Sequence, residues 1–307
     1  MSSSMMSSSS SEPKFVYGKD DALFGCIEEQ QGDRPFGDFL DAGTGTHSMR
    51  WIATLHEKGL SSFTAITADA AMKRKVETEA QNLGLYDNHY RRNGGSINSS
   101  GSNHSIHSSL SGGSNVSVLM GNWFPKAPHE SLRFDQQFDT ILADYLIGAM
   151  DGFSPYKQDE MIPLLLNLLK PGGRLYIVGL EPIPDEVVGR ENVVCKVRRV
   201  RDACILLAGH RCYREYPLAW IHKECQKQKE RARLLDTRTF PILYRHNTIV
   251  RQINVARSKF PYFPTQDLVD SMKQVLDRLE QQSLHFTEDA PIKLGFDYVV
   301  AVEKLEE

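Results

Sequence analysis

Hydrophobic positions along the chain form short apolar runs that alternate with segments of helical period. The runs lack the strict alternation of a half-exposed strand, so each predicts a strand buried on both faces. They occupy residues 39–42, 63–68, 116–120, 138–143 and 174–180. The helical segments occupy residues 49–58, 70–83 and 156–169. Strands that alternate with helices predict an α/β fold with a parallel sheet covered on both faces.

The helix over 156–169 has its own start and stop signals. Ser154 and Pro155 predict an N-cap followed by proline in the first turn. Pro163 predicts a kink or a split, because it lacks a backbone N–H. The run Lys170-Pro171-Gly172-Gly173 predicts the end of the helix before the next strand.

The C-terminal third continues with helical material and two further strands. Apolar residues recur at helical spacing at Val193, Val197, Val200, Cys204 and Leu207, which predicts a helix with one face in the core. Another helix is expected over 268–284, and the last strands over 240–244 and 296–302. Lys196, Arg198, Arg199 and Arg201 follow the opposite face of the first of these helices. Such a charge run indicates a solvated face or recognition of an acidic acceptor.

Two low-complexity stretches interrupt this pattern. Residues 1–13 are dominated by Met and Ser and predict a disordered tail. Residues 93–115 consist almost wholly of Gly, Ser, Asn and His, and predict a surface loop inserted in an existing connection. The remainder, 14–307, is interpreted as a single domain with its core at 38–180 and an acceptor-side elaboration at 181–307.

Composition narrows the class of protein. The chain has 307 residues, 40% of them hydrophobic, and a net charge of -3, which argues against a nucleic-acid-coating protein. No apolar run reaches the length of a membrane span. The five cysteines form no CxxC pair and follow no signal peptide, so reduced thiols in the cytoplasm are expected ahead of an organelle. A zinc site is a minor alternative, because its candidates His210, Cys212, His222 and Cys225 fit no standard ligand spacing, and no metal is expected.

Candidate chemistry gathers where the predicted strands end, since parallel sheets bind ligands at the carboxyl ends of their strands. The first strand ends in Asp41-Ala42-Gly43-Thr44-Gly45, where glycines permit a tight turn close to a ligand. Asp41 suits an ammonium group but would repel a pyrophosphate. Ser48 replaces the third glycine of the dinucleotide fingerprint. Both details favour S-adenosylmethionine (SAM) over a dinucleotide.

The next three strand ends carry polar side chains as well. Asp69 suits the two ribose hydroxyls, although a helix N-cap is the structural alternative. Asn122 offers an amide to an adenine edge. Trp123 or Phe124 stacks on the base or belongs to the core, and Asp144 faces the mouth of the site.

These motifs, in this order, resemble class I SAM-dependent methyltransferases, and the resemblance extends over about residues 38–180. It implies a Rossmann-like, mostly parallel seven-stranded sheet with helices on both faces and helical additions in the C-terminal third. It also implies SAM as cofactor. The methionine part would lie against Asp41, Gly43, Thr44 and Gly45, the ribose against Asp69, and the adenine against Asn122 and Trp123. Asp144 would face the methionine amino group or the acceptor.

The sequence departs from the family pattern at several positions. His47 stands at the usual third glycine of the first motif, and Asn122 at a frequent Asp. No Asn-Pro-Pro-Tyr follows the fourth strand, and the paired glutamates of arginine methyltransferases are missing. These differences argue against methylation of base amines, planar amides and arginine.

The resulting hypothesis is methyl transfer to a small molecule, with a protein acceptor left open and no nucleic-acid partner. Asp144 and Tyr145 are the catalytic candidates, and the candidates for a general base that accepts a proton from the acceptor are Asp144, His47 and His210. The predicted acceptor walls are Tyr145, Asp151, Phe153, His210, Tyr213, Tyr244 and Arg245. The alternatives are a non-catalytic SAM-fold binding protein, a nicotinamide oxidoreductase lacking its Tyr-x-x-x-Lys, and an aminopropyl transferase.

Overall fold

The computed structural model describes residues 21–85, 108–109, 115–125, 132–134 and 137–306. The predicted tail and nearly all of the predicted insert therefore lie outside the described residues.

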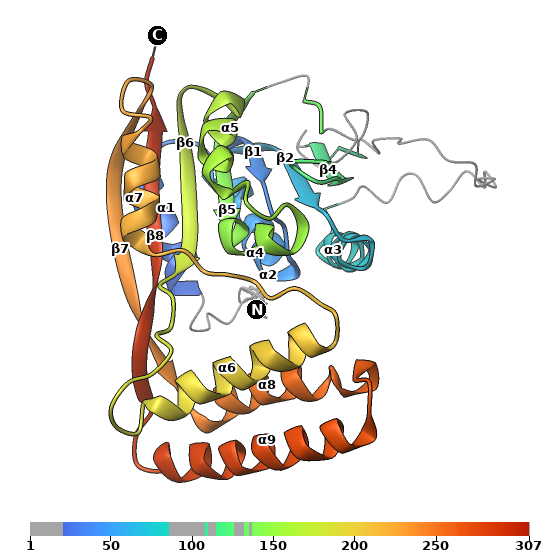
Figure 1. The fold of residues 1–307 in the computed structure, drawn as a ribbon. Helices are drawn as coiled ribbons and strands as arrows, with labels where there is room; N and C mark the ends of the chain where they lie inside the picture. Colours follow the sequence, from blue (N-terminus) through green and yellow to red (C-terminus); the bar gives the residue numbers. More distant parts are fainter. Residues whose placement is uncertain (1–20, 86–107, 110–114, 126–131, 135–136, 307) are drawn as a thin grey trace, which may run out of the picture.

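A single twisted sheet organises the described chain (Figure 1). Its order is β3-β4-β2-β1-β5-β6-β8-β7. Seven strands are long: β1 (Gly37–Asp41), β2 (Leu60–Thr67), β4 (Asn115–Met120), β5 (Phe138–Asp144), β6 (Leu169–Leu180), β7 (Ala232–Tyr244) and β8 (Ile292–Lys304). β3 (Ser108–Ser109) adds two residues at one edge. β4, β2, β1, β5 and β6 pair in parallel, and β8 pairs antiparallel with both β6 and β7. The predicted mostly parallel sheet is confirmed.

Helices cover both faces because alternate strand residues point to opposite sides. In β1, Phe39 packs with α1, α2 and α3, whereas Leu40 packs with α4, α5 and α7. These helices are α1 (Asp21–Gln31), α2 (Thr46–Ile52), α3 (Ala70–Asn82), α4 (Leu146–Phe153), α5 (Gln158–Leu168) and α7 (Leu218–Gln226). Short 3-10 turns complete the helical material at η1 (Leu55–Lys58) and η4 (Phe260–Tyr262).

A third layer consists of α6 (Asn192–Leu207), α8 (His246–Arg257) and α9 (Gln266–Phe286). These helices pack on one another around their own apolar core, which also takes in the ends of β7 and β8. Figure 1 shows this layer beyond the carboxyl edge of the sheet, the edge at which the parallel strands end. The predicted helical additions are therefore present, and they lie on the side where the site is expected.

Several local predictions around the fourth strand are wrong. Ser154 ends α4, a helix that the sequence pattern did not reveal, and the next helix begins only at Gln158. Pro163 lies inside α5 without splitting it. The run from Lys170 to Gly173 is included in β6, but the register with β5 passes from Leu169 directly to Arg174, so this run bulges out of the ladder. Gly172 within it has a φ of 72°, and regular pairing of β6 begins at Arg174, the predicted start of the strand.

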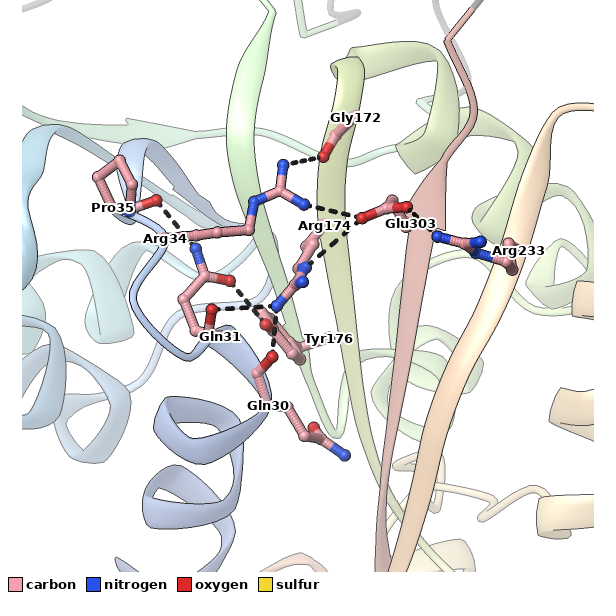
Figure 2. Close-up of polar contacts among 9 residues, drawn as sticks. All are labelled: Gln30, Gln31, Arg34, Pro35, Gly172, Arg174, Tyr176, Arg233 and Glu303. Carbon is pink, nitrogen blue, oxygen red and sulfur yellow. Dashed lines mark hydrogen bonds and ion pairs between the residues drawn. The ribbon is translucent and has the colours of Figure 1, made fainter.

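The amino edge of the sheet, opposite the helical layer, is closed by a polar network (Figure 2). Glu303 of β8 forms ion pairs with Arg34, Arg174 and Arg233 at 2.8, 3.9 and 2.8 Å. Arg34 also donates to the carbonyl of Gly172 at 2.5 Å. This network joins the segment after α1 to β6, β7 and β8. None of the described helices is long and apolar enough to span a bilayer.

Candidate functional site

Hydrogen bonds from the loops that follow β1 and β4 connect the ends of β1, β2 and β4 at the carboxyl edge. The N–H of Thr44 donates to the carbonyl of Ile66 at 2.8 Å, and the N–H of Gly121 to that of Thr67 at 3.0 Å. The indole of Trp123 donates to the carbonyl of Ala42 at 2.7 Å. β1 lies between β2 and β5, where the chain order reverses, and such a switch point is the usual ligand site of an open α/β sheet.

Asp41 stabilises the turn after β1 through hydrogen bonds of its side chain. Its carboxylate accepts from Ser48 Oγ at 2.6 Å and from the N–H of Gly43 at 3.5 Å. The side chain is fully buried, and this burial raises its pKa to about 6 despite those hydrogen bonds. The direct contact with an ammonium group stays a prediction, since the observed role is to hold the turn.

The two glycines of the turn differ in their surroundings. A Cβ on Gly43 would come within 3.0 Å of the Leu146 side chain, so a larger residue here would require Leu146 of α4 to shift. A Cβ on Gly45 would meet no atom within 4 Å. Gly45 therefore faces open space, as a residue lining a ligand site must.

Asp69 is exposed at the end of β2 and begins α3. Its Oδ1 accepts from the N–H of Met72 at 2.7 Å, which is N-cap geometry. Asp69 is therefore the N-cap of α3, and it fills this role through Oδ1 alone. Because a carboxylate has two oxygens, Oδ2 retains its acceptor capacity, and capping does not prevent contact with a ribose.

Asn122 and Trp123 make contacts within the protein. Asn122 donates to the carbonyl of Phe153 at 3.0 Å and accepts from the hydroxyl of Ser154 at 2.5 Å, so it joins the loop after β4 to the end of α4. Trp123 stacks on Phe134 with ring centroids 5.9 Å apart. Their predicted contacts with adenine stay predictions, and the observed contacts shape the wall of the site.

The end of β5 leads into α4 through a strained residue. Tyr145 has a left-handed backbone with φ of 48°, which is costly for a residue with a Cβ. Its N–H donates to the carbonyl of Val178, and its hydroxyl donates to Asp297 Oδ1 at 2.8 Å. Two strands, β6 and β8, thus fix Tyr145 immediately after Asp144.

A connection that we call the strap, residues 208–217, crosses the carboxyl edge between α6 and α7 (Figure 1). It lies on α4, where the N–H of Arg214 donates to the carbonyl of Gly148 at 3.3 Å. A Cβ on Gly148 would come within 2.7 Å of the Glu215 carboxylate, and a Cβ on Gly152 within 3.2 Å of the Tyr213 ring. These two glycines, four residues apart, form the seat of the strap.

The strap brings titratable side chains to the site. Burial and the nearby charge of Asp297 raise the pKa of Glu215 to about 7, while the charge of Arg201 opposes the shift. Within the described residues the Glu215 carboxylate has no hydrogen bond or ion pair. Burial and the nearby charge of Asp69 both raise the pKa of Tyr213.

The predicted acceptor residues separate into two groups. Asp151 and Tyr213 lie at the contact between α4 and the strap, where Asp151 pairs with Arg214 at 3.7 Å, and Phe153 is exposed at the end of α4. The others lie against the helical layer: His210 of the strap packs edge-on against Tyr262, Tyr244 at the end of β7 lines a cavity, and Arg245 is the exposed N-cap of α8.

Sequence reasoning missed Glu215 and the seat of the strap. The Gly148-x-x-x-Gly152 spacing was a usable signal, because small residues four apart let another chain segment approach a helix closely. His47, a proposed base, packs against Phe24 of α1 with ring centroids 5.2 Å apart. In the part of the chain that the structure describes, no three His, Cys, Asp or Glu side chains are grouped as metal ligands would be.

Comparison with known proteins yields matches in structure alone. No family model matches the chain, and no curated protein matches its sequence. A proposed methyltransferase from Bacillus halodurans superposes with a TM-score of 0.53 at 11% identity, covering 94% of this chain and 100% of that one. The YcgJ protein from Bacillus subtilis gives 0.51 at 17% identity, covering 94% and 99%. At such identities the likeness establishes the fold, which is that of class I SAM-dependent methyltransferases.

Proposed function

We propose that this chain is a SAM-dependent methyltransferase acting on a small-molecule acceptor in the cytoplasm. The observation that carries the proposal is the convergence of the glycine turn after β1 with the end of β2. The hydrogen bond from Thr44 to Ile66 joins the two, leaving Gly45 and Asp69 facing open space at the switch point of the sheet.

The residues present suit the cofactor. Gly45 leaves room for close approach, Asp69 has an uncommitted carboxylate oxygen for ribose hydroxyls, and Asn122 borders the adenine end. Asp144 and the strained Tyr145 border the end at which the methyl group would be transferred. SAM, when bound, supplies a methyl group already activated by its positively charged sulfur.

The protein's part in such a reaction is chiefly alignment, since held geometry contributes as much as about 7–11 kcal/mol to lowering a barrier. Tyr145 is held by hydrogen bonds to β6 and β8, and the strap by a hydrogen bond to α4. Where the acceptor carries a proton, Glu215 is the group suited to accept it, because it lies on the strap with a pKa near neutrality.

Titration calorimetry tests the proposal directly. We expect micromolar binding of S-adenosylhomocysteine (SAH) and SAM, and much weaker binding of NAD. Transfer of labelled methyl groups from SAM into a small-molecule cell extract tests turnover. Tighter binding of NAD than of SAH would refute the proposal, and SAH binding without turnover would favour the non-catalytic alternative.

A further inference from the structure

A cavity of about 100 Å³ lies within the helical layer, next to the carboxyl end of β6. Apolar side chains such as Leu180, Val194 and Ile249 form most of its wall. Its polar wall consists of Arg198, Arg201, Tyr244 and Gln252. The volume suffices for a polar head group and a short run of carbon atoms.

Every polar group of this wall is suited to donate hydrogen bonds. Burial raises the pKa of Tyr244 to about 12, so its hydroxyl keeps its proton. Gln252 Oε1 already accepts from Arg201 at 2.6 Å, which leaves the amide NH₂ as the uncommitted group of Gln252. The Nε of Arg198 is buried without a hydrogen-bond partner among the described residues. A buried donor without a partner is costly, and a ligand oxygen would satisfy it.

Both charged groups that line the cavity are cations, whereas the carboxylates around them lie outside its wall. Arg198 and Arg201 share Asp202, at 3.6 and 2.7 Å, while the second partner of Arg198, Asp185, is almost fully exposed and screened by solvent. Asp297 of β8 and Glu215 of the strap are the other acidic groups nearby: the charge of Asp297 raises the pKa of Tyr244, and the charge of Arg201 lowers the pKa of both Tyr244 and Glu215. The cavity itself is lined by two guanidinium groups and no carboxylate.

The cavity adjoins the mouth of the cofactor site. Asp144 is in register with Val178 of β6, and Leu180, which lines the cavity, is two residues further on. Two residues of a strand span about 7 Å. Leu180 is in turn the register partner of Asp297, which accepts from Tyr145. The cavity therefore begins one strand neighbour away from the residues proposed to border the methyl-transfer position.

We propose that this cavity binds the carboxylate of the methyl acceptor, which is an organic acid with an apolar body. The inference rests on the proposed function. The carboxylate is the anchored end, so the methylated atom belongs to the opposite end of the molecule. Of the two explanations for the charge run on α6, recognition of an acidic acceptor then applies to Arg198 and Arg201, while the exposed Lys196 and Arg199 form the solvated face.

Three probes of matched size test the inference on protein saturated with SAH: 3-phenylpropionate, 3-phenylpropanol and 3-phenylpropylamine. Calorimetry should show the acid binding at least ten-fold more tightly than the alcohol or the amine. Arg198→Lys, which keeps the charge but removes Nε, and Tyr244→Phe, which removes only the hydroxyl, should each weaken the acid at least five-fold. Arg199→Met, on the same helix outside the cavity, should change nothing.

Equal or tighter binding of the amine or the alcohol, or no binding of any probe to the SAH complex, would overturn the inference. Unchanged affinity of the acid for both cavity variants would do the same, because the acid would then bind elsewhere. Failure of the wild-type protein to bind SAH would instead refute the proposed function. The affinity for SAH serves as the folding control for each variant.

Discussion

Two glutamates at opposite edges of the sheet have opposite electrostatic surroundings. At the amino edge, Glu303 is surrounded by Arg34, Arg174 and Arg233, and its side chain is only 15% exposed (Figure 2). At the carboxyl edge, Glu215 is held against Gly148 with no ion pair among the described residues, and its pKa rises to about 7.

We relate this difference in ion pairing to the role of each edge. A carboxylate neutralised by neighbouring cations stabilises a junction between elements but leaves little for a ligand to gain. A carboxylate buried without a partner is unfavourable for folding, and such groups gather at functional sites. The amino edge is therefore interpreted as scaffold and the carboxyl edge as the site.

The largest effect is expected at the amino edge. Glu303→Gln leaves three arginines without their shared partner, one of them, Arg174, largely buried. We expect the free energy of unfolding to fall by about 3 kcal/mol in urea titration. The affinity for SAH should stay within two-fold. The exposed Glu186→Gln is the matched control, and a loss below about 0.5 kcal/mol would show that the network contributes little.

The next effect is expected in cofactor affinity. Asp69→Asn keeps an N-cap for α3 but removes the charge that would meet a ribose. The dissociation constant of SAH should rise roughly 10- to 100-fold, since hydrogen bonds to charged groups contribute about 1.5–3 kcal/mol. The melting temperature should hardly change. A change in affinity below three-fold would mean that Asp69 serves only as the cap.

The pH dependence of stability probes Glu215 itself. Its folded pKa of about 7 exceeds the ordinary 4.5, so the folded state holds the proton more strongly in that interval. The free energy of unfolding therefore falls as pH rises from about 4.5 to 7, and the full penalty is present above 7.

Glu215→Gln should remove that penalty. We expect the variant to be more stable than wild type by about 2 kcal/mol at pH 8 and nearly equal at pH 4.5. Asp41, whose pKa is raised to about 6, titrates in both proteins and cancels from the difference. Urea titrations across this range measure the effect, and parallel curves for the two proteins would contradict it.

The smallest effect is expected for Trp123→Phe. The variant loses the hydrogen bond to Ala42, and stability should fall by about 1 kcal/mol. The affinity for SAH should stay within three-fold if the observed packing on Phe134 is the role of the ring. A loss above ten-fold would restore the interpretation that Trp123 stacks on adenine.

The sequence by itself predicted the parallel part of the sheet and placed the candidates for the cofactor site at its carboxyl edge. Apolar runs predict buried strands, and a residue at or just after the end of such a strand lies at the carboxyl edge by that fact alone. The positions of Asp41, Gly45, Asp69 and Asp144 all follow from this rule. Local signals were less dependable: Ser154 and Pro155 predict the start of a helix, whereas Ser154 ends α4.

Only the tertiary structure brought together the residues that we propose for the acceptor half. Glu215, Gly148 and Asp297 come from a connection, a short helix and the last strand, and no spacing in the sequence relates them. Arg198 and Arg201 resemble their solvated neighbours until α8 and β7 close a cavity over them. A side chain's environment depends on which distant elements pack against it, so the same charge run supplies a solvent-facing surface and the wall of a cavity.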